Sequence, residues 1–175
     1  ENGFMPNIDS GADASGDLTI DLGFTAAAVT SDFGDWNGSG TLTSTTSSTM
    51  STNLRLGATV DAETSVTPDA NATADGVDED GVNPLPIMTA GGWGWLNTTV
   101  TNNTGAGANL NAWIDFNNDG DFADAGEQIV TNYAVATAST DALKFIPFQV
   151  PAAAVTATNL GMRVRLTSTP SPGPT

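Results

Sequence analysis

The sequence predicts an all-β protein, an antiparallel β-sandwich of the jelly-roll or Ig-like kind with very little helix. Short segments alternate apolar and polar residues, and turn-forming Gly, Asn and Asp residues separate them. No amphipathic segment keeps the helical period for more than two turns. The acidic residues are 16 Asp and 4 Glu, and Asp favours turns where Glu favours helices.

The first predicted strand covers residues 18–24, where Leu18, Ile20, Leu22 and Phe24 share one face. Residues 39–52 are mostly Ser and Thr, which predicts an exposed loop or a ragged edge strand. A second alternating segment starts at Leu54 and reaches residue 60.

The remaining strands follow a long acidic loop over residues 65–83. In the segment 110–114, Leu110, Ala112 and Ile114 share a face, and Trp113 faces the other way. The other predicted strands are residues 93–101, 128–136, 142–150 and 160–167. Short strands at this spacing are typical of a β-sandwich.

Three parts of the chain are expected. Residues 1–30 are an N-terminal linker and strand, residues 31–170 the sandwich module, and residues 171–175 a linker or truncated end. The apolar face of residues 18–24 needs a partner sheet. It either packs on its own sandwich or self-assembles by inserting into an open edge of a neighbouring subunit.

The charge and composition exclude several classes of function. A net charge of −16 with 4 basic residues argues against nucleic acid and against anionic membranes. Neither Cys nor His is present, which removes disulfides, zinc sites with Cys or His ligands and the Ser-His-Asp triad. No apolar run is long enough for membrane insertion. We therefore expect a non-catalytic, extracellular or cell-surface protein.

The segment from Asp115 to Glu127 predicts a calcium site. Oxygen-bearing side chains at alternate positions, with Gly120 at the bend, suit a hard cation that takes 6–8 oxygen ligands. The predicted ligands are Asp115, Asn117, Asp119, Asp121 and Glu127, with Asp124 as a second choice. The final acid comes one position later than in an EF-hand, and strands flank the loop. The alternative is a hairpin rich in turn-forming residues, without a metal.

A second acidic group lies in three separate segments. Its members are Asp32, Asp35, Asp61, Glu63, Asp75, Asp78, Glu79 and Asp80. They form either a second calcium site, for which we select Asp32, Asp35, Asp61, Glu63, Asp78 and Asp80, or solvated acidic loops.

Several of these motifs occur together in one known family. The motifs beginning at Asp32, Leu54, Asp75 and Leu110 resemble the GEVED domain of bacterial secreted and surface proteins, and residues 113–129 are the most specific part of the match. The resemblance covers about residues 31–170 and implies an extracellular β module without known catalysis. Residues 17–24 resemble the closing strand of a B-type repeat of bacterial surface proteins.

The expected function is a calcium-stabilised structural or adhesive module, or a filament subunit assembled through residues 17–24. Its partners would be other copies or neighbouring modules of the same protein, or a cell-surface glycan or protein. The alternative is a carbohydrate-binding module that stacks sugars on Trp36, Trp93 and Trp95, with Tyr133 as a further aromatic candidate.

Overall fold

A computed structural model of the 175-residue chain describes residues 31–33, 47–60, 62, 81–83, 85, 87–155, 159–170 and 173–174. These residues form two three-stranded sheets and one two-stranded sheet, all antiparallel. The strands are β1 (Ser31–Asp32), β2 (Ser48–Thr49), β3 (Leu54–Leu56), β4 (Trp93–Asn102), β5 (Ala108–Ile114), β6 (Gln128–Val135), β7 (Ser139–Gln149) and β8 (Met162–Thr167).

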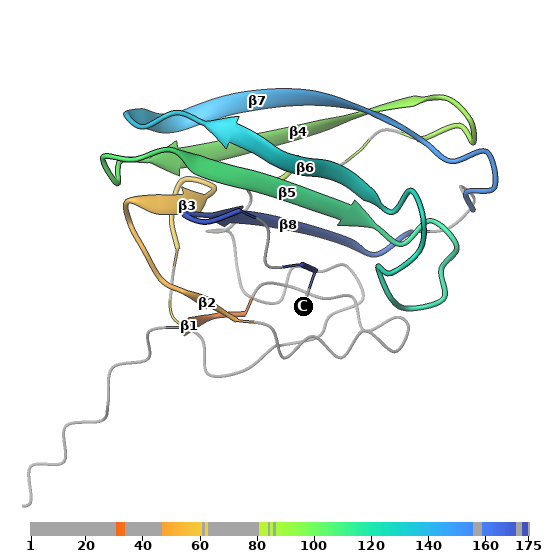
Figure 1. Ribbon diagram of the computed structural model, residues 1–175, viewed down its shortest axis with the longest axis horizontal. Helices are drawn as coiled ribbons and strands as arrows, with labels where there is room; N and C mark the ends of the chain where they lie inside the picture. Colours follow the sequence, from red (N-terminus) through yellow and green to blue (C-terminus); the bar gives the residue numbers. More distant parts are fainter. Residues whose placement is uncertain are drawn as a thin grey trace, which may run out of the picture.

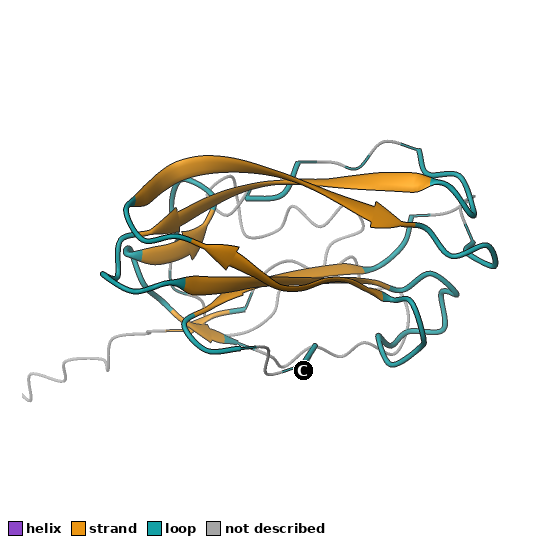
Figure 2. Cartoon of the chain, turned by 45° about the horizontal axis from the view of Figure 1, so that its top comes forward, coloured by secondary structure: helices purple, strands orange, loops and turns teal. Residues whose placement is uncertain are grey.

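The two larger sheets form a sandwich. One sheet has the order β3-β4-β7 and the other the order β6-β5-β8, and they lie as two layers (Figures 1 and 2). At the sides of the sandwich, β7 lies beside β6 and β3 beside β8. Strands β5, β6 and β7 therefore follow one another around the sandwich, and β8 returns beside β5, which is a Greek-key connection. The predicted all-β sandwich is confirmed.

The core lies between the two sheets and follows the alternation seen in the sequence. Leu96 and Val100 point inward from β4, and Leu110, Ala112 and Ile114 point inward from β5. Val130, Val135, Ile146, Phe148 and Val150 from the later strands and their ends complete the centre. Apolar burial of this kind is the main favourable term in folding.

Gly94 gives the core a close contact that no other residue allows. It lies opposite Phe148 in the pairing of β4 with β7. A Cβ atom at position 94 would lie 2.3 Å from Cζ of Phe148, so the aromatic ring rests directly on the Gly94 backbone.

Two segments pair with β4 along the edge that faces away from β7. Strand β3 pairs with Val100 to Asn102 and ends at Leu56, earlier than the predicted limit at residue 60. Gly57 then turns away with a φ of 71°, and residues 81–83 continue the edge through a bridge between Val82 and Thr98. The backbone N–H of Thr99 donates to Gly81 O at 2.7 Å.

The outer faces of the two sheets differ. On β5, Trp113 points away from the core yet is only 2% exposed. On the neighbouring strand β8, the guanidinium groups of Arg163 and Arg165 donate to the backbone carbonyls of Pro174 and Gly173. The chain end, predicted to be a linker, thus contacts β8 at these two residues.

In the part of the chain that the structure describes, no helix is long and apolar enough to cross a membrane. The predicted strand at residues 18–24 lies outside the described residues, as does the rest of segment 1–30.

Candidate metal centre

The predicted calcium loop joins β5 to β6 at one end of the sandwich. Its base is closed by a backbone hydrogen bond in which Ile114 N donates to Glu127 O at 2.9 Å. Phe116 packs in the core between the sheets, and the Phe122 ring lies under the guanidinium group of Arg163 on β8, 5.6 Å from its centroid. The two side chains are 3% and 6% exposed, so the loop is anchored by apolar contacts as well as by its two strands.

Asp115 is buried and organises the first half of the loop. Its Oδ1 atom accepts from Asp119 N at 3.2 Å, and its Oδ2 atom accepts from Gly120 N at 2.9 Å. Gly120 has a φ of 94°, a conformation in which a side chain is strained, so the tight turn under the Asp115 carboxylate requires glycine.

Glu127 is buried as well and holds the second half of the loop. Its Oε1 atom accepts from Phe116 N and its Oε2 atom from Asp124 N, both at 3.1 Å. Burial raises the pKa of Glu127 and the charge of Asp115 raises it further, while the two backbone N–H groups lower it. Because burial is the largest of these effects, the pKa of Glu127 lies above that of a free glutamate, so this carboxylate binds a proton more readily.

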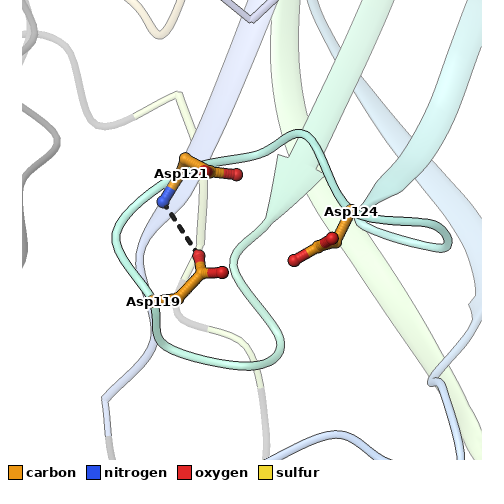
Figure 3. Close-up of side chains that lie close together, drawn as sticks. All are labelled: Asp119, Asp121 and Asp124. Atoms are coloured by element: carbon orange, nitrogen blue, oxygen red, sulfur yellow. Dashed lines mark hydrogen bonds between the residues drawn. The ribbon is translucent and has the colours of Figure 1, made fainter.

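The remaining three acids gather on the exposed side of the loop. Carboxylate oxygens of Asp119, Asp121 and Asp124 lie within 4.8 Å of one another, and all three residues are exposed (Figure 3). Figure 3 shows the Asp124 side chain pointing across the loop toward the other two. A single ion placed between them would contact a carboxylate from each.

Asn117 lies between two of these acids. Its Nδ2 atom donates to Asp119 Oδ2 at 2.9 Å and to Asp124 Oδ2. Its Oδ1 atom accepts from Asp119 N at 3.1 Å. The amide nitrogen therefore bridges carboxylates that would otherwise face each other, while the amide oxygen holds the backbone of Asp119.

The exposed acids also fold their own backbone. Asp119 Oδ1 accepts from Asp121 N at 3.2 Å, and Asp121 Oδ1 accepts from Ala123 N at 2.8 Å. These are Asx turns, in which a side chain stands in for a backbone acceptor. These turns bring successive carboxylates to one side of the loop. The sequence pattern alone does not fix the distance between them.

No Lys or Arg in the described part of the chain forms an ion pair with these three carboxylates. Like charges at this separation repel. The group offers only oxygen donors, from carboxylates and one amide, and such donors suit a hard cation such as Ca²⁺ better than a transition metal. The residues present therefore fit the predicted ion.

The structure divides the predicted ligands into two sets. Asp119 and Asp121 lie in the exposed group, together with the second-choice residue Asp124. Asp115 and Glu127 are buried and occupied with backbone N–H groups. The sequence signal for this division is the apolar residue beside each end of the loop, because Phe116 next to Asp115 is in the core and Ile129, two residues after Glu127, packs against it.

Most residues of the other predicted sites cannot be placed. Of the second acidic group, Asp32 lies in β1, and Asp35, Asp61, Glu63, Asp75, Asp78, Glu79 and Asp80 lie outside the described residues. So do Leu18, Ile20, Leu22, Phe24 and Trp36. Trp93 and Trp95 lie on β4 and are 67% and 52% exposed, while Tyr133 lies on β6 in the other sheet.

Searches among the curated proteins and among the solved structures found no match. The family model of the GEVED domain matches residues 109–175. This range starts in β5 and includes the whole acidic loop and strands β6, β7 and β8. It is shorter than the resemblance over residues 31–170 but contains its most specific part, residues 113–129. Domains of this family are generally found in extracellular proteins. Residues 109–175 therefore match the GEVED domain family, as the sequence motifs predicted.

Proposed function

We propose that this protein is a non-catalytic structural or adhesive module of a bacterial surface or secreted protein, and that calcium stabilises it. The observation that carries the calcium assignment is the convergence of the Asp119, Asp121 and Asp124 carboxylates within 4.8 Å. The family match and the sandwich fold support the structural role.

Calcium would act on the loop and, through it, on the sandwich. The ion neutralises the repulsion among the three exposed carboxylates, with the Asn117 amide oxygen as a further donor. Asp115 and Glu127 keep the loop backbone in place. Because the loop joins the end of β5 to the start of β6, an ordered loop holds two strands of one sheet together.

Thermal unfolding with and without calcium tests this role. An ion that binds the folded state alone stabilises it by about 2.7 kcal/mol at a concentration 100 times its Kd. For a chain of this size that is a rise in melting temperature of roughly 5–11 °C. We expect this rise on addition of Ca²⁺ and its loss with excess chelator. An identical melting curve in both conditions would contradict the assignment.

Single substitutions link the effect to the loop. Asp124→Asn removes one carboxylate of the exposed group and should reduce the calcium-dependent rise by at least half. Asp141→Asn is the matched control, because it removes the same charge at an exposed position on β7, where Asp141 pairs with Arg55 at 3.3 Å. It should lower stability equally with and without calcium.

Assembly through residues 17–24 is the finer form of this proposal. The apolar face formed by Leu18, Ile20, Leu22 and Phe24 supports it. Removal of residues 1–24 should abolish large particles in light scattering while the melting transition stays cooperative. Particles of unchanged size would exclude assembly through this segment.

A carbohydrate-binding module is the second candidate function. It is favoured by the exposure of Trp93 and Trp95, two residues apart on one face of β4. Stacking of a sugar on these indoles should quench Trp fluorescence. The buried Trp113 would not respond, so the quenching should disappear in the Trp93→Thr and Trp95→Thr variants.

A further inference from the structure

The outer face of the β3-β4-β7 sheet carries a continuous apolar surface. Trp93 and Trp95 alternate outward from β4, and Leu143 and Phe145 alternate outward from β7. The exposed fractions are 67% and 52% for the two Trp residues, 50% for Leu143 and 59% for Phe145. We call these four side chains the outer patch.

Register makes the outer patch contiguous. Trp95 pairs with Pro147, and Phe145 pairs with Asn97, so Trp95 and Phe145 are diagonal neighbours across the two strands. Trp93 and Trp95 stand about 6.6–6.8 Å apart along β4. The patch therefore runs diagonally over the sheet from Trp93 through Trp95 and Phe145 to Leu143.

The face around the outer patch carries no net charge in a strongly acidic molecule. The outward positions along β4 and β7 beside the patch are Asn97, Thr99, Pro147 and Gln149, none of them ionisable. Beyond Leu143, the carboxylate of Asp141 is paired with Arg55 of β3 at 3.3 Å. The chain has a net charge of −16. A second copy that approached an acidic surface would meet repulsion, whereas two copies of this face can touch without bringing unpaired carboxylates together.

We infer that the outer patch is an interface with a second copy of this chain, in which the two β3-β4-β7 sheets pack face to face. An interface of this kind is isologous, with the same residues contributed by each copy. Sheets pack in this way at about 10 Å, with side chains from both faces interdigitating. Exposed apolar patches with aromatic residues and no charges are typical of the centre of protein interfaces.

The polar groups of this face favour a protein partner over a sugar. A sugar needs donors and acceptors for its hydroxyl groups beside the stacking rings. Here the Gln149 amide nitrogen already donates to Gly91 O at 2.9 Å and to Gly92 O at 3.0 Å. The other fully exposed positions next to the rings are the aliphatic residues Pro147 and Leu143, and Asn97 opposite Phe145 is half-buried. Such a face is completed best by other apolar side chains.

The area of the patch sets the strength of the contact. Large side chains bury about 150–250 Å² each, so at the observed exposure the four offer on the order of 500 Å² per copy. A total near 1,000 Å² is at the lower limit of specific interfaces. We therefore expect a weak, reversible dimer with a Kd between about 1 µM and 1 mM. Neighbouring copies on one surface would raise this association through their local concentration.

Sedimentation equilibrium of the full chain, over 10 µM to 1 mM protein and in excess chelator, tests the inference independently of calcium. We expect a monomer–dimer equilibrium that strengthens from about 50 to 500 mM NaCl, since salt screens the repulsion between two acidic copies. Trp95→Thr and Phe145→Glu should each weaken the dimer at least tenfold, because each substitution acts twice in an isologous interface. Both positions are exposed, and a cooperative melt confirms that each variant folds.

Tyr133→Thr is the matched control, since Tyr133 is 39% exposed on β6 in the opposite sheet, and its dimer should match the wild type. A wild-type chain that stays monomeric at 1 mM would overturn the inference. So would a dimer that survives Trp95→Thr but is lost when residues 1–24 are removed, which would assign the contact to the N-terminal segment. Monomers that cosediment with a neutral polysaccharide such as cellulose, dependent on Trp95, would assign the face to glycan instead.

Discussion

The Oε1 atom of Glu127 accepts a hydrogen bond from the backbone N–H of Phe116 at 3.1 Å, so a residue at the end of the acidic loop holds its beginning. The other oxygen of the same buried carboxylate accepts from Asp124 N. The loop thus has an internal frame of its own, and the exposed acids are displayed on that frame.

The pH dependence of the unfolding free energy in calcium-free buffer should show the protonation of the Glu127 carboxylate. Its pKa in the folded chain is raised above the ordinary value of 4.5, chiefly by burial. Between 4.5 and the raised value, the folded state binds more protons than the unfolded state. The contribution of this group to the unfolding free energy therefore falls as pH rises through that window.

Glu127→Gln removes this titration, and urea unfolding from pH 4 to 8 in chelator measures the result. As pH rises above 4.5, the wild type should lose stability relative to the variant. A difference in unfolding free energy that is constant with pH would show that Glu127 titrates normally.

Replacement of Asn117 by Asp should have opposite effects with and without calcium. In chelator, the change adds a negative charge beside Asp119 and Asp124 and removes the amide that bridges them, so stability should fall by about 1 kcal/mol or more. With calcium, the added carboxylate should tighten binding and restore the melting temperature. Paired thermal melts measure both effects, and a loss that calcium leaves unchanged would place Asn117 outside the site.

Gly94→Ala should destabilise the core. The new Cβ atom would lie 2.3 Å from Phe148 Cζ, and overpacking of this kind costs about 1–3 kcal/mol. Gly107→Ala is the control, because no atom lies within 4 Å of its added Cβ. Urea unfolding should show a lower midpoint for the first variant and little change for the second. Equal midpoints would mean that Phe148 can move aside freely.

Asn102 should tolerate substitution far less than its neighbour Asn103. It is fully buried, and its amide nitrogen donates to Ala106 O at 2.9 Å and Val135 O at 3.1 Å. Asn102→Asp removes the amide donor from both carbonyls and buries a charge, so a loss of about 3 kcal/mol or more is expected.

Asn103→Asp makes the same chemical change at an exposed position and should cost under about 0.5 kcal/mol. Chemical unfolding of the two variants checks the difference. Similar stabilities would show that Asn102 does not connect the turn between β4 and β5 to the end of β6.

Much of the sandwich was predictable because it depends on local pattern. Apolar alternation in β4 to β8 placed each strand within a few residues of its observed limits. The acidic loop was located in the same way, by oxygen-bearing residues between two strands. The strand that starts at Leu54 was predicted to continue to residue 60, but it ends at Leu56. Its end depends on residues 81–83, which take over the edge of β4 from that point.

The spacing of the loop acids did not predict which of them come together. Asp115 and Asp119 are both regular members of the pattern, yet Asp115 is buried under Gly120 and Asp119 is exposed beside Asp124. Asp115 lies between the core residues Ile114 and Phe116, which hold it at the interior, whereas Asp119 lies in the exposed part of the loop.

The sequence by itself determined the all-β class, the positions of β4 to β8 and the acidic loop, because period, turn chemistry and charge are properties of neighbouring residues. The tertiary structure alone decided which Trp residues meet solvent. Trp95 and Trp113 both alternate with core residues on central strands, but one is 52% exposed and the other 2%. Alternation indicates that a side chain points away from the core. Whether the opposite face of the sheet is covered depends on the packing of segments that are distant in the sequence.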